Sequence, residues 1–278
     1  MNIYKVLPSL TKKRQMNIWH KALRSQWSAE DIKWEKAQRI TSDSLKDQLA
    51  RVLTPVLMGE QSALYSVSGL IPVLGHEGEV ESQFYLTTWA VDEARHTELF
   101  ARFYNRIGRE PLPIRRFPAG YIFQSKIVSK DTAEWLAGVL ISECLAKILL
   151  EDFRRLDLDP VLSDICDGIL TDEARHLGFN HIYLEERFAG LFKSDTPKGR
   201  AFSDQLRARM AHVLSFIPPI LTALASDSKA VGLDTDALYA KLAEDSTRRL
   251  EKSIAAGERV AQGKDIASEL SKAESVGA

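Results

Sequence analysis

The sequence predicts an all-α protein, and three observations support that prediction. Apolar residues recur at intervals of three and four along most of the chain, which is the spacing of an amphipathic helix. Only 15 glycines and 10 prolines occur in 278 residues, so turn signals are sparse. Helix-start residues such as Ser28 and Asp131 precede long periodic runs, and Gly108 follows one. Long helices are therefore expected instead of strands.

The first predicted helix runs from Ser28, a plausible N-cap, towards residue 43. The second covers "SLKDQLARVLTPVLMGEQSALYSVSGL" at 44–70, and Pro55 in its interior predicts a kink or an early-turn position. The third runs from about residue 77 to 107 and stops at Gly108, with "PLPIRRFPAG" as the following loop.

The second half of the chain continues the helical pattern. A fourth helix starts near Asp131 and ends before "DLDP", and a fifth covers about 160–189 and closes at Gly190. Two further helical stretches follow, one broken at Pro218 and Pro219 and one over about 235–262. We expect one domain over residues 1–262 and a flexible tail over 263–278.

Charge and composition narrow the classes of partner. Lys and Arg number 37 against 38 Asp and Glu, so a nucleic-acid or anionic-membrane partner is not expected. The longest apolar stretch, "FIPPILTALA" at 216–225, is about half a membrane span and contains two prolines. Cys144 and Cys166 fit no disulfide framework. A soluble cytoplasmic protein is expected.

The pentapeptide "DEARH" occurs twice, at 92–96 and at 172–176. In a helix, Glu93 and His96 lie about 60° apart around the axis and about 4.5 Å apart along it, so both side chains converge on one point. Glu173 and His176 have the same spacing. A divalent transition metal binds imidazole and carboxylate together, so each pair is half of a predicted metal site.

Two isolated glutamates complete the predicted sites. Glu60 in "LMGEQSAL" and Glu143 in "LISECLAK" are single acidic residues in apolar surroundings, where an unpaired carboxylate is costly to bury. Glu60 precedes Glu93 by 33 residues and Glu143 precedes Glu173 by 30, separations that suit a helix, a tight turn and an antiparallel return. Solvated charged helix faces are the alternative interpretation.

The remaining charged residues of the two pentapeptides also repeat. Asp92 and Asp172 precede the predicted metal-binding glutamates and could each accept the outer ring N–H of the opposing histidine, which fixes its tautomer. Arg95 and Arg175 could neutralise these aspartates. The alternative is a pair of surface ion pairs that contribute little.

This pattern resembles the ferritin-like di-iron carboxylate proteins over roughly residues 27–190, in the branch of monooxygenase hydroxylases, acyl-carrier-protein desaturases and ribonucleotide reductase small subunits. The resemblance implies a four-helix bundle with extra helices at both ends. It also implies two iron ions, or a Mn/Fe pair, and dioxygen as co-substrate. We expect a small organic substrate, a ferredoxin or reductase as electron donor, and a homodimer.

Single positions separate the subgroups of this branch. Phe100 stands where the radical-storing subunits place a tyrosine. Ala63 and Gly138 replace the valine and tyrosine that are crosslinked in the ligand-binding oxidases. Ile169 stands where the arylamine N-oxygenases add a third histidine, which counts against that subgroup. Together with Ala146, the small residues predict room for a substrate beside the metals.

Two further side chains have alternative interpretations. Lys147, one turn beyond Glu143, could reach into the cavity as a counter-ion or proton donor in catalysis, or extend along the helix to water. Trp27 in "QWSAEDIKW" resembles the tryptophan that links the metals to the surface in ribonucleotide reductase small subunits, and could equally be a packing residue.

The sequence thus favours a dimetal oxygenase or oxidase that oxidises a small organic molecule. A radical-generating subunit for another protein is the first alternative, and Phe100 counts against it. An iron-storage protein is the second, and the helices outside the bundle count against it.

Overall fold

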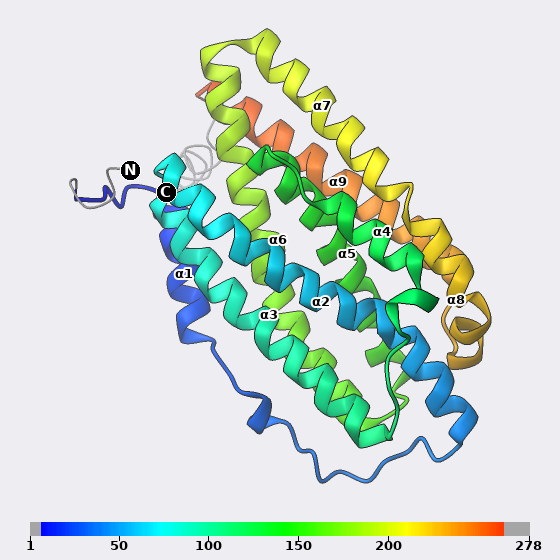
Figure 1. Cartoon of the computed structure of the whole chain (residues 1–278). Helices are drawn as coiled ribbons and strands as arrows, with labels where there is room; N and C mark the ends of the chain where they lie inside the picture. The colour runs from blue at the N-terminus through cyan, green and yellow to red at the C-terminus, as the bar shows by residue number, and fades with distance from the viewer. Residues whose placement is uncertain (1–6, 264–278) are drawn as a thin grey trace, which may run out of the picture.

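Four long helices form the centre of the molecule, arranged as two antiparallel pairs (Figure 1). The computed structural model describes residues 7–263, and within that range it contains helices and no strand. One pair is α2 (Asp43–Glu77) with α3 (Val80–Ile107), and the other is α5 (Thr132–Leu156) with α6 (Pro160–Ser194). The predicted all-α bundle is confirmed.

Short turns make each pair antiparallel. Gly78 follows α2 with a φ of 79°, a left-handed conformation that glycine adopts without strain, and α3 begins two residues later. At the other turn Asp157 has a φ of 46°, and the Asp159 carboxylate caps α6 by accepting a hydrogen bond from the N–H of Val161 at 3.0 Å. These turns place Glu60 opposite Glu93 and Glu143 opposite Glu173.

The predicted helix at 28–43 is wrong. Only a 3₁₀ turn, η1 (Ala29–Asp31), forms there, and α2 starts at Asp43. Ser28 does cap η1, but Arg106 of α3 donates a 2.7 Å hydrogen bond to the carbonyl of Trp34 and another to that of Lys36. The backbone is thus bound to the bundle and runs as an extended segment past the end of α3 (Figure 1).

The other helices surround the bundle. They are α1 (Lys13–Arg24), α4 (Pro118–Ile127), α7 (Thr196–Leu214), α8 (Ile217–Val231) and α9 (Thr235–Ala261). Helix α1 packs on α3 and α6, while α9 lies along α5 and α6 (Figure 1). The predicted loop at 111–120 is partly wrong, because Pro118 starts α4, and α6 continues through Gly190 to Ser194.

Three further predictions concern Pro55, a membrane span and the C-terminal tail. Helix α2 passes Pro55 without a break, so that proline is not in an early turn. Among the described residues, the stretch Thr196–Val231 is long and apolar enough to cross a membrane. This is weak evidence for a membrane span, because the stretch consists of the two separate helices α7 and α8. The predicted tail at 263–278 lies, except for Gly263, outside the described residues.

The space predicted beside Gly138 is filled by backbone. A Cβ at this position would lie 2.6 Å from the carbonyl oxygen of Ile127, at the end of α4. The expectation that Gly138 leaves room for a substrate is therefore wrong, because the glycine lets α4 approach α5 closely.

Gly138→Ala is expected to lower the free energy of unfolding by about 1–3 kcal/mol, because the backbone of α4 must move away. Gly190→Ala is the matched control, since a Cβ at Gly190 meets no atom within 4 Å and α6 is helical there. We expect that substitution to be neutral or slightly stabilising. Urea unfolding of both variants measures the difference, and equal stabilities would contradict the close-packing explanation.

An ion pair joins α1 to α6. Arg14 Nη2 donates to Glu185 Oε2 at 3.1 Å, and His181 Nε2 lies 3.3 Å from the same oxygen. Burial alone raises the pKa of Glu185, but the hydrogen bonds from His181 and Arg14 outweigh it and lower the pKa to about 2. The ionised carboxylate is thus favoured in the folded protein.

Glu185→Gln is expected to cost about 2 kcal/mol of unfolding free energy at neutral pH. Because the folded pKa lies below the unfolded value of about 4.3, the contribution of Glu185 is fully present above about pH 5 and is lost as the pH falls towards 2. The difference between wild type and variant should shrink over that window. Urea unfolding of metal-free protein at several pH values tests this, with Glu244→Gln on α9 as the exposed control.

Candidate metal centre

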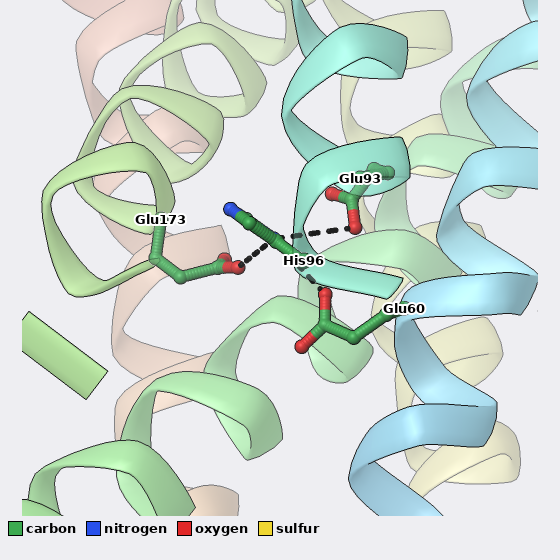
Figure 2. A group of neighbouring side chains, drawn as sticks. All are labelled: Glu60, Glu93, His96 and Glu173. Carbon is green, nitrogen blue, oxygen red and sulfur yellow. Dashed lines mark hydrogen bonds and ion pairs between the residues drawn. The ribbon is translucent and has the colours of Figure 1, made fainter. Parts of the chain in front are cut away.

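The first half of the site lies around His96. Helix α3 places Glu93 and His96 on its inner face, and α2 and α6 contribute Glu60 and Glu173 (Figure 2). His96 Nδ1 lies 3.1 Å from Glu60 Oε2, 3.6 Å from Glu93 Oε2 and 3.7 Å from Glu173 Oε1. One imidazole nitrogen thus faces carboxylates from three helices.

The second half repeats this arrangement around His176. Its Nδ1 lies 3.1 Å from Glu143 Oε2, 3.4 Å from Glu93 Oε1 and 3.6 Å from Glu173 Oε2. Glu93 and Glu173 therefore belong to both groups, and within each group one ligand atom per residue lies within 4.8 Å of the others. The arrangement provides two adjacent positions that share two carboxylates.

The electrostatics of this cluster fit a pair of cations. All six side chains are almost fully buried, and burial together with the neighbouring Glu143 carboxylate raises the pKa of Glu93 to about 8 and that of Glu173 well above its usual value. Glu60 Oε1, Glu93 Oε2 and Glu173 Oε2 accept no hydrogen bond from the described residues. Two divalent transition metals would neutralise the carboxylates and engage these oxygens.

The outer nitrogens of the histidines face aspartates from the opposite pair of helices. His96 Nε2 lies 3.1 Å from Asp172 Oδ2, and His176 Nε2 lies 3.3 Å from Asp92 Oδ2. Because an ionised carboxylate only accepts hydrogen bonds, Nε2 is the donor in each ring. Nδ1 faces the glutamates, which is the position that a metal ligand requires. Burial alone lowers the pKa of both histidines, but hydrogen bonds to the aspartates and glutamates outweigh it and raise the pKa well above its usual value, so the protonated ring is favoured without a metal.

Two buried arginines hold these aspartates. Arg95 Nη2 donates to Asp172 Oδ2 at 2.8 Å and also to Asp92, while Arg175 Nη2 donates to Asp92 Oδ2 at 3.1 Å and also to Asp172. Burial alone raises the pKa of Asp172, but hydrogen bonds and charges from His96 and Arg95 outweigh it and lower the pKa. The two arginines and two aspartates form a buried charged network, not surface ion pairs.

The segment before α2 adds two side chains to this network. Trp27 Nε1 donates to Asp172 Oδ2 at 2.9 Å, and Gln26 Nε2 donates to Asp92 Oδ1 at 3.1 Å. The guanidinium of Arg95 lies 4.8 Å from the centre of the Trp27 ring. A Cβ at Gly168 would lie 2.4 Å from that ring, so the glycine leaves space for the indole.

Sequence reasoning missed Trp89 and Gln26. Trp89 Nε1 donates to Glu93 Oε1 at 2.7 Å, and its ring stacks on His176 with centroids 4.5 Å apart. The signal for Trp89 was its position four residues before Glu93, on the same helix face. Gln26 had no comparable signal, because the path of the extended segment brings it to Asp92.

Among the described residues, Lys147 forms an ion pair with Glu151 and with none of the six residues of the cluster. Its Nζ is 2.6 Å from Glu151 Oε1, one turn further along α5. The side chain lines a cavity between α5, α6 and α9. The catalytic role predicted for Lys147 stays a prediction, and its contacts are those of a side chain at the rim of a separate cavity.

An all-helical bundle with two adjacent carboxylate and histidine groups at its centre defines a ferritin-like dimetal protein. Residues 71–253 match the family model described as P-aminobenzoate N-oxygenase AurF, and the chain belongs to this family. It is therefore a di-iron oxidoreductase of the oxygenase or oxidase type, with dioxygen as co-substrate.

Solved structures agree on the fold. An R2-like ligand-binding oxidase mutant with an anaerobically reconstituted Mn/Fe cofactor has a TM-score of 0.66 at 18% identity, covering 86% of this chain and 92% of that one. The same kind of oxidase with an aerobically reconstituted Mn/Fe cofactor, after a long soak, has a TM-score of 0.63 at 18% identity, with coverages of 86% and 92%. The ferritin-like architecture is confirmed.

The family match corrects one expectation. Ile169 counted against the arylamine N-oxygenases, yet the chain matches the AurF family over residues 71–253. The buried side chain of Ile169 occupies the position of the third histidine, so this chain has no histidine ligand there. One substituted ligand position therefore does not exclude membership of the family.

Proposed function

We propose that the protein binds two iron ions through Glu60, Glu93, His96, Glu143, Glu173 and His176, and oxidises a small organic amine. The observation that carries the proposal is the convergence of two carboxylate and histidine groups that share Glu93 and Glu173. When bound, the ions supply the activation of dioxygen. A Mn/Fe pair fits the same ligand types.

The other residues of the centre prepare this site. Asp92 and Asp172 hold the histidine rings so that Nδ1 faces the glutamates. Arg95 and Arg175 keep those aspartates ionised, and burial of the whole network keeps water out. Trp89 fixes the orientation of Glu93 by its hydrogen bond.

A mostly apolar crevice lies between α2, α4, α5 and α8. Its volume of about 20 Å³ is room for one water-sized group, so the crevice must widen before an aromatic ring can enter. Gly59 adjoins Glu60 in the chain, and Ser142 and Ala146 flank Glu143. The name of the family points to oxidation at an amine nitrogen. We therefore infer an aromatic amine as substrate.

We further infer that a reductase or ferredoxin supplies the electrons. The hydrogen bonds that Asp172 accepts from Trp27 and from His96 would join the partly exposed indole to the first metal position. A cytoplasmic homodimer with one ferritin-like domain per chain, over residues 1–262, is the assembly that we propose. Sedimentation of the purified protein tests the dimer.

Addition of Fe(II) to metal-free protein under anaerobic conditions is expected to raise the free energy of unfolding by about 2.7 kcal/mol for each site at 100 times its Kd. Thermal unfolding and metal analysis measure the stabilisation and a stoichiometry of about two. Rapid mixing with oxygen should then give an optical change and consume dioxygen. Protein that binds no transition metal, or that does not react with oxygen once loaded, would overturn the proposal.

A further inference from the structure

Aromatic side chains extend from the metal centre along the interface between α3 and α6. Trp89 and Tyr85 lie one turn apart on α3, and His176, Phe179 and Tyr183 occupy successive turns of α6, so the members of each set share a helix face. The two helices are in contact. We call Trp89, Tyr85, Phe179 and Tyr183 the aromatic series.

Each ring of the aromatic series packs directly on the next. The Trp89 ring, stacked on His176, forms an edge-to-face pair with Phe179 at a centroid distance of 6.0 Å. Tyr85 contacts both, at 6.0 Å from Trp89 and stacked on Phe179 at 4.5 Å. The Phe179 ring lies 6.2 Å from that of Tyr183. All of these spacings are those of packed aromatic pairs, so the rings are continuous from His176 to Tyr183.

The outer end of the aromatic series lies at a cavity on the surface. The three inner rings are fully buried, whereas Tyr183 is 6% exposed and lines a cavity of about 270 Å³. Charged side chains line the same cavity, namely Lys12, Glu79, Glu186 and Arg187. Solvent therefore reaches the series at Tyr183 and not at the rings nearer the metal centre.

The two tyrosines differ in whether a phenol proton can leave. A tyrosine that loses an electron becomes strongly acidic, so a stable tyrosyl radical forms only where the proton has an acceptor. Tyr85 Oη is buried and has no hydrogen-bond partner among the described residues. Tyr183 lines a cavity that also contains the carboxylates of Glu79 and Glu186. Tyr85 can thus bridge neighbouring rings, but Tyr183 is the residue on which a radical can persist.

We propose that the aromatic series carries an oxidising equivalent away from the metal centre when dioxygen reacts there without an organic substrate. Trp89 loses one electron to the oxidised centre. Tyr183 then returns one electron to Trp89 and releases its phenol proton to solvent in the cavity, which leaves a neutral tyrosyl radical. A thiol in solution gives this radical a hydrogen atom and becomes a thiyl radical. The inference rests on the proposed function and adds a protective reaction to it, because the buried ligands are spared oxidation.

Electron paramagnetic resonance of iron-loaded protein tests the proposal. The protein is frozen soon after mixing with oxygen, without substrate or thiol, and its metal content and dioxygen consumption are measured on the same samples. A tyrosyl signal is expected, which narrows when the protein contains ring-deuterated tyrosine. Tyr183→Phe should abolish the signal, whereas Tyr65→Phe, a change at an exposed tyrosine of α2, should leave it unchanged.

Oxidative damage at Trp89 provides a second readout. Without Tyr183 the oxidised Trp89 is not reduced, so mass spectrometry of Tyr183→Phe after repeated exposure to oxygen should find more hydroxylated Trp89 than in wild type. Metal content and the first round of dioxygen consumption should not change, because Tyr183 lies about two turns of α6 beyond His176. Circular dichroism checks that the variant folds.

The outcomes separate this inference from the proposed function. Loaded protein that consumes dioxygen but gives no tyrosyl signal would overturn the inference and leave the proposed function intact. A tyrosyl signal that persists in Tyr183→Phe would place the radical on another residue and would also overturn it. Protein that binds no metal or does not react with oxygen would contradict the proposed function itself, and the inference that rests on it.

Discussion

Glu173→Gln is expected to abolish the binding of both metal ions and to reduce dioxygen consumption more than 100-fold. Glu173 lies in both carboxylate and histidine groups, with oxygens 3.7 Å from His96 Nδ1 and 3.6 Å from His176 Nδ1. Replacing a residue that only positions a ligand typically lowers metal affinity or activity about 10- to 100-fold, so replacing a shared ligand should lower them more. Metal analysis should find less than one ion per chain where wild type holds about two.

The same substitution should not destabilise the metal-free protein. Burial and the neighbouring Glu143 raise the pKa of Glu173 well above its usual value, so its ionised form opposes folding. A neutral amide removes that cost, and the metal-free variant is expected to unfold at the same temperature as wild type or higher. Loss of metal binding without loss of stability would distinguish the loss of a ligand from misfolding.

A matched control for Glu173→Gln is Glu98→Gln, an exposed change on α3. It should keep both ions and the full rate of dioxygen consumption. If Glu173→Gln still holds two ions, Glu173 is not a shared ligand. The proposed arrangement of the centre would then be wrong.

The core of the candidate site could be predicted because its geometry is local. The spacing of three residues brings Glu93 to His96 whatever the tertiary structure, provided the segment is helical. Glu60 and Glu143 needed only one further assumption, a tight turn between two helices, and Gly78 and Asp157 provide those turns. Local periodicity and short connections thus determine most of the bundle.

Features that depend on distant parts of the chain could not be predicted in this way. Ser28 has the sequence of a helix start, yet Arg106 holds the following backbone in an extended path, and this path brings Gln26 and Trp27 to the aspartates. Gly138 suggested space beside the metals, but the end of α4 fills it. Neither contact follows from the period of the sequence, because each joins segments that only the folded structure brings together.

The charged network behind the histidines makes Asp172→Ala the substitution with the largest expected effect on stability. Asp172 accepts hydrogen bonds from Trp27 Nε1 at 2.9 Å, from Arg95 Nη2 at 2.8 Å and from His96 Nε2 at 3.1 Å, and a further one from Arg175. Removing the carboxylate leaves two buried guanidinium groups with one partner aspartate. We expect a loss of about 3–5 kcal/mol of unfolding free energy, the range for breaking a buried ion pair.

Asp92→Ala should cost less than Asp172→Ala, although the two aspartates occupy equivalent positions. Both lose contacts to Arg95, Arg175 and one histidine, but Asp172 also accepts from the partly buried Trp27 indole, whereas Asp92 accepts from the exposed side chain of Gln26. Asp167→Ala, which removes a half-exposed ion pair with Arg154, should change stability by less than about 1 kcal/mol. Urea unfolding of the metal-free variants gives this order. Equal costs for all three would mean that the buried network contributes no more than a surface ion pair, and His96 would then lack the support that a metal ligand requires.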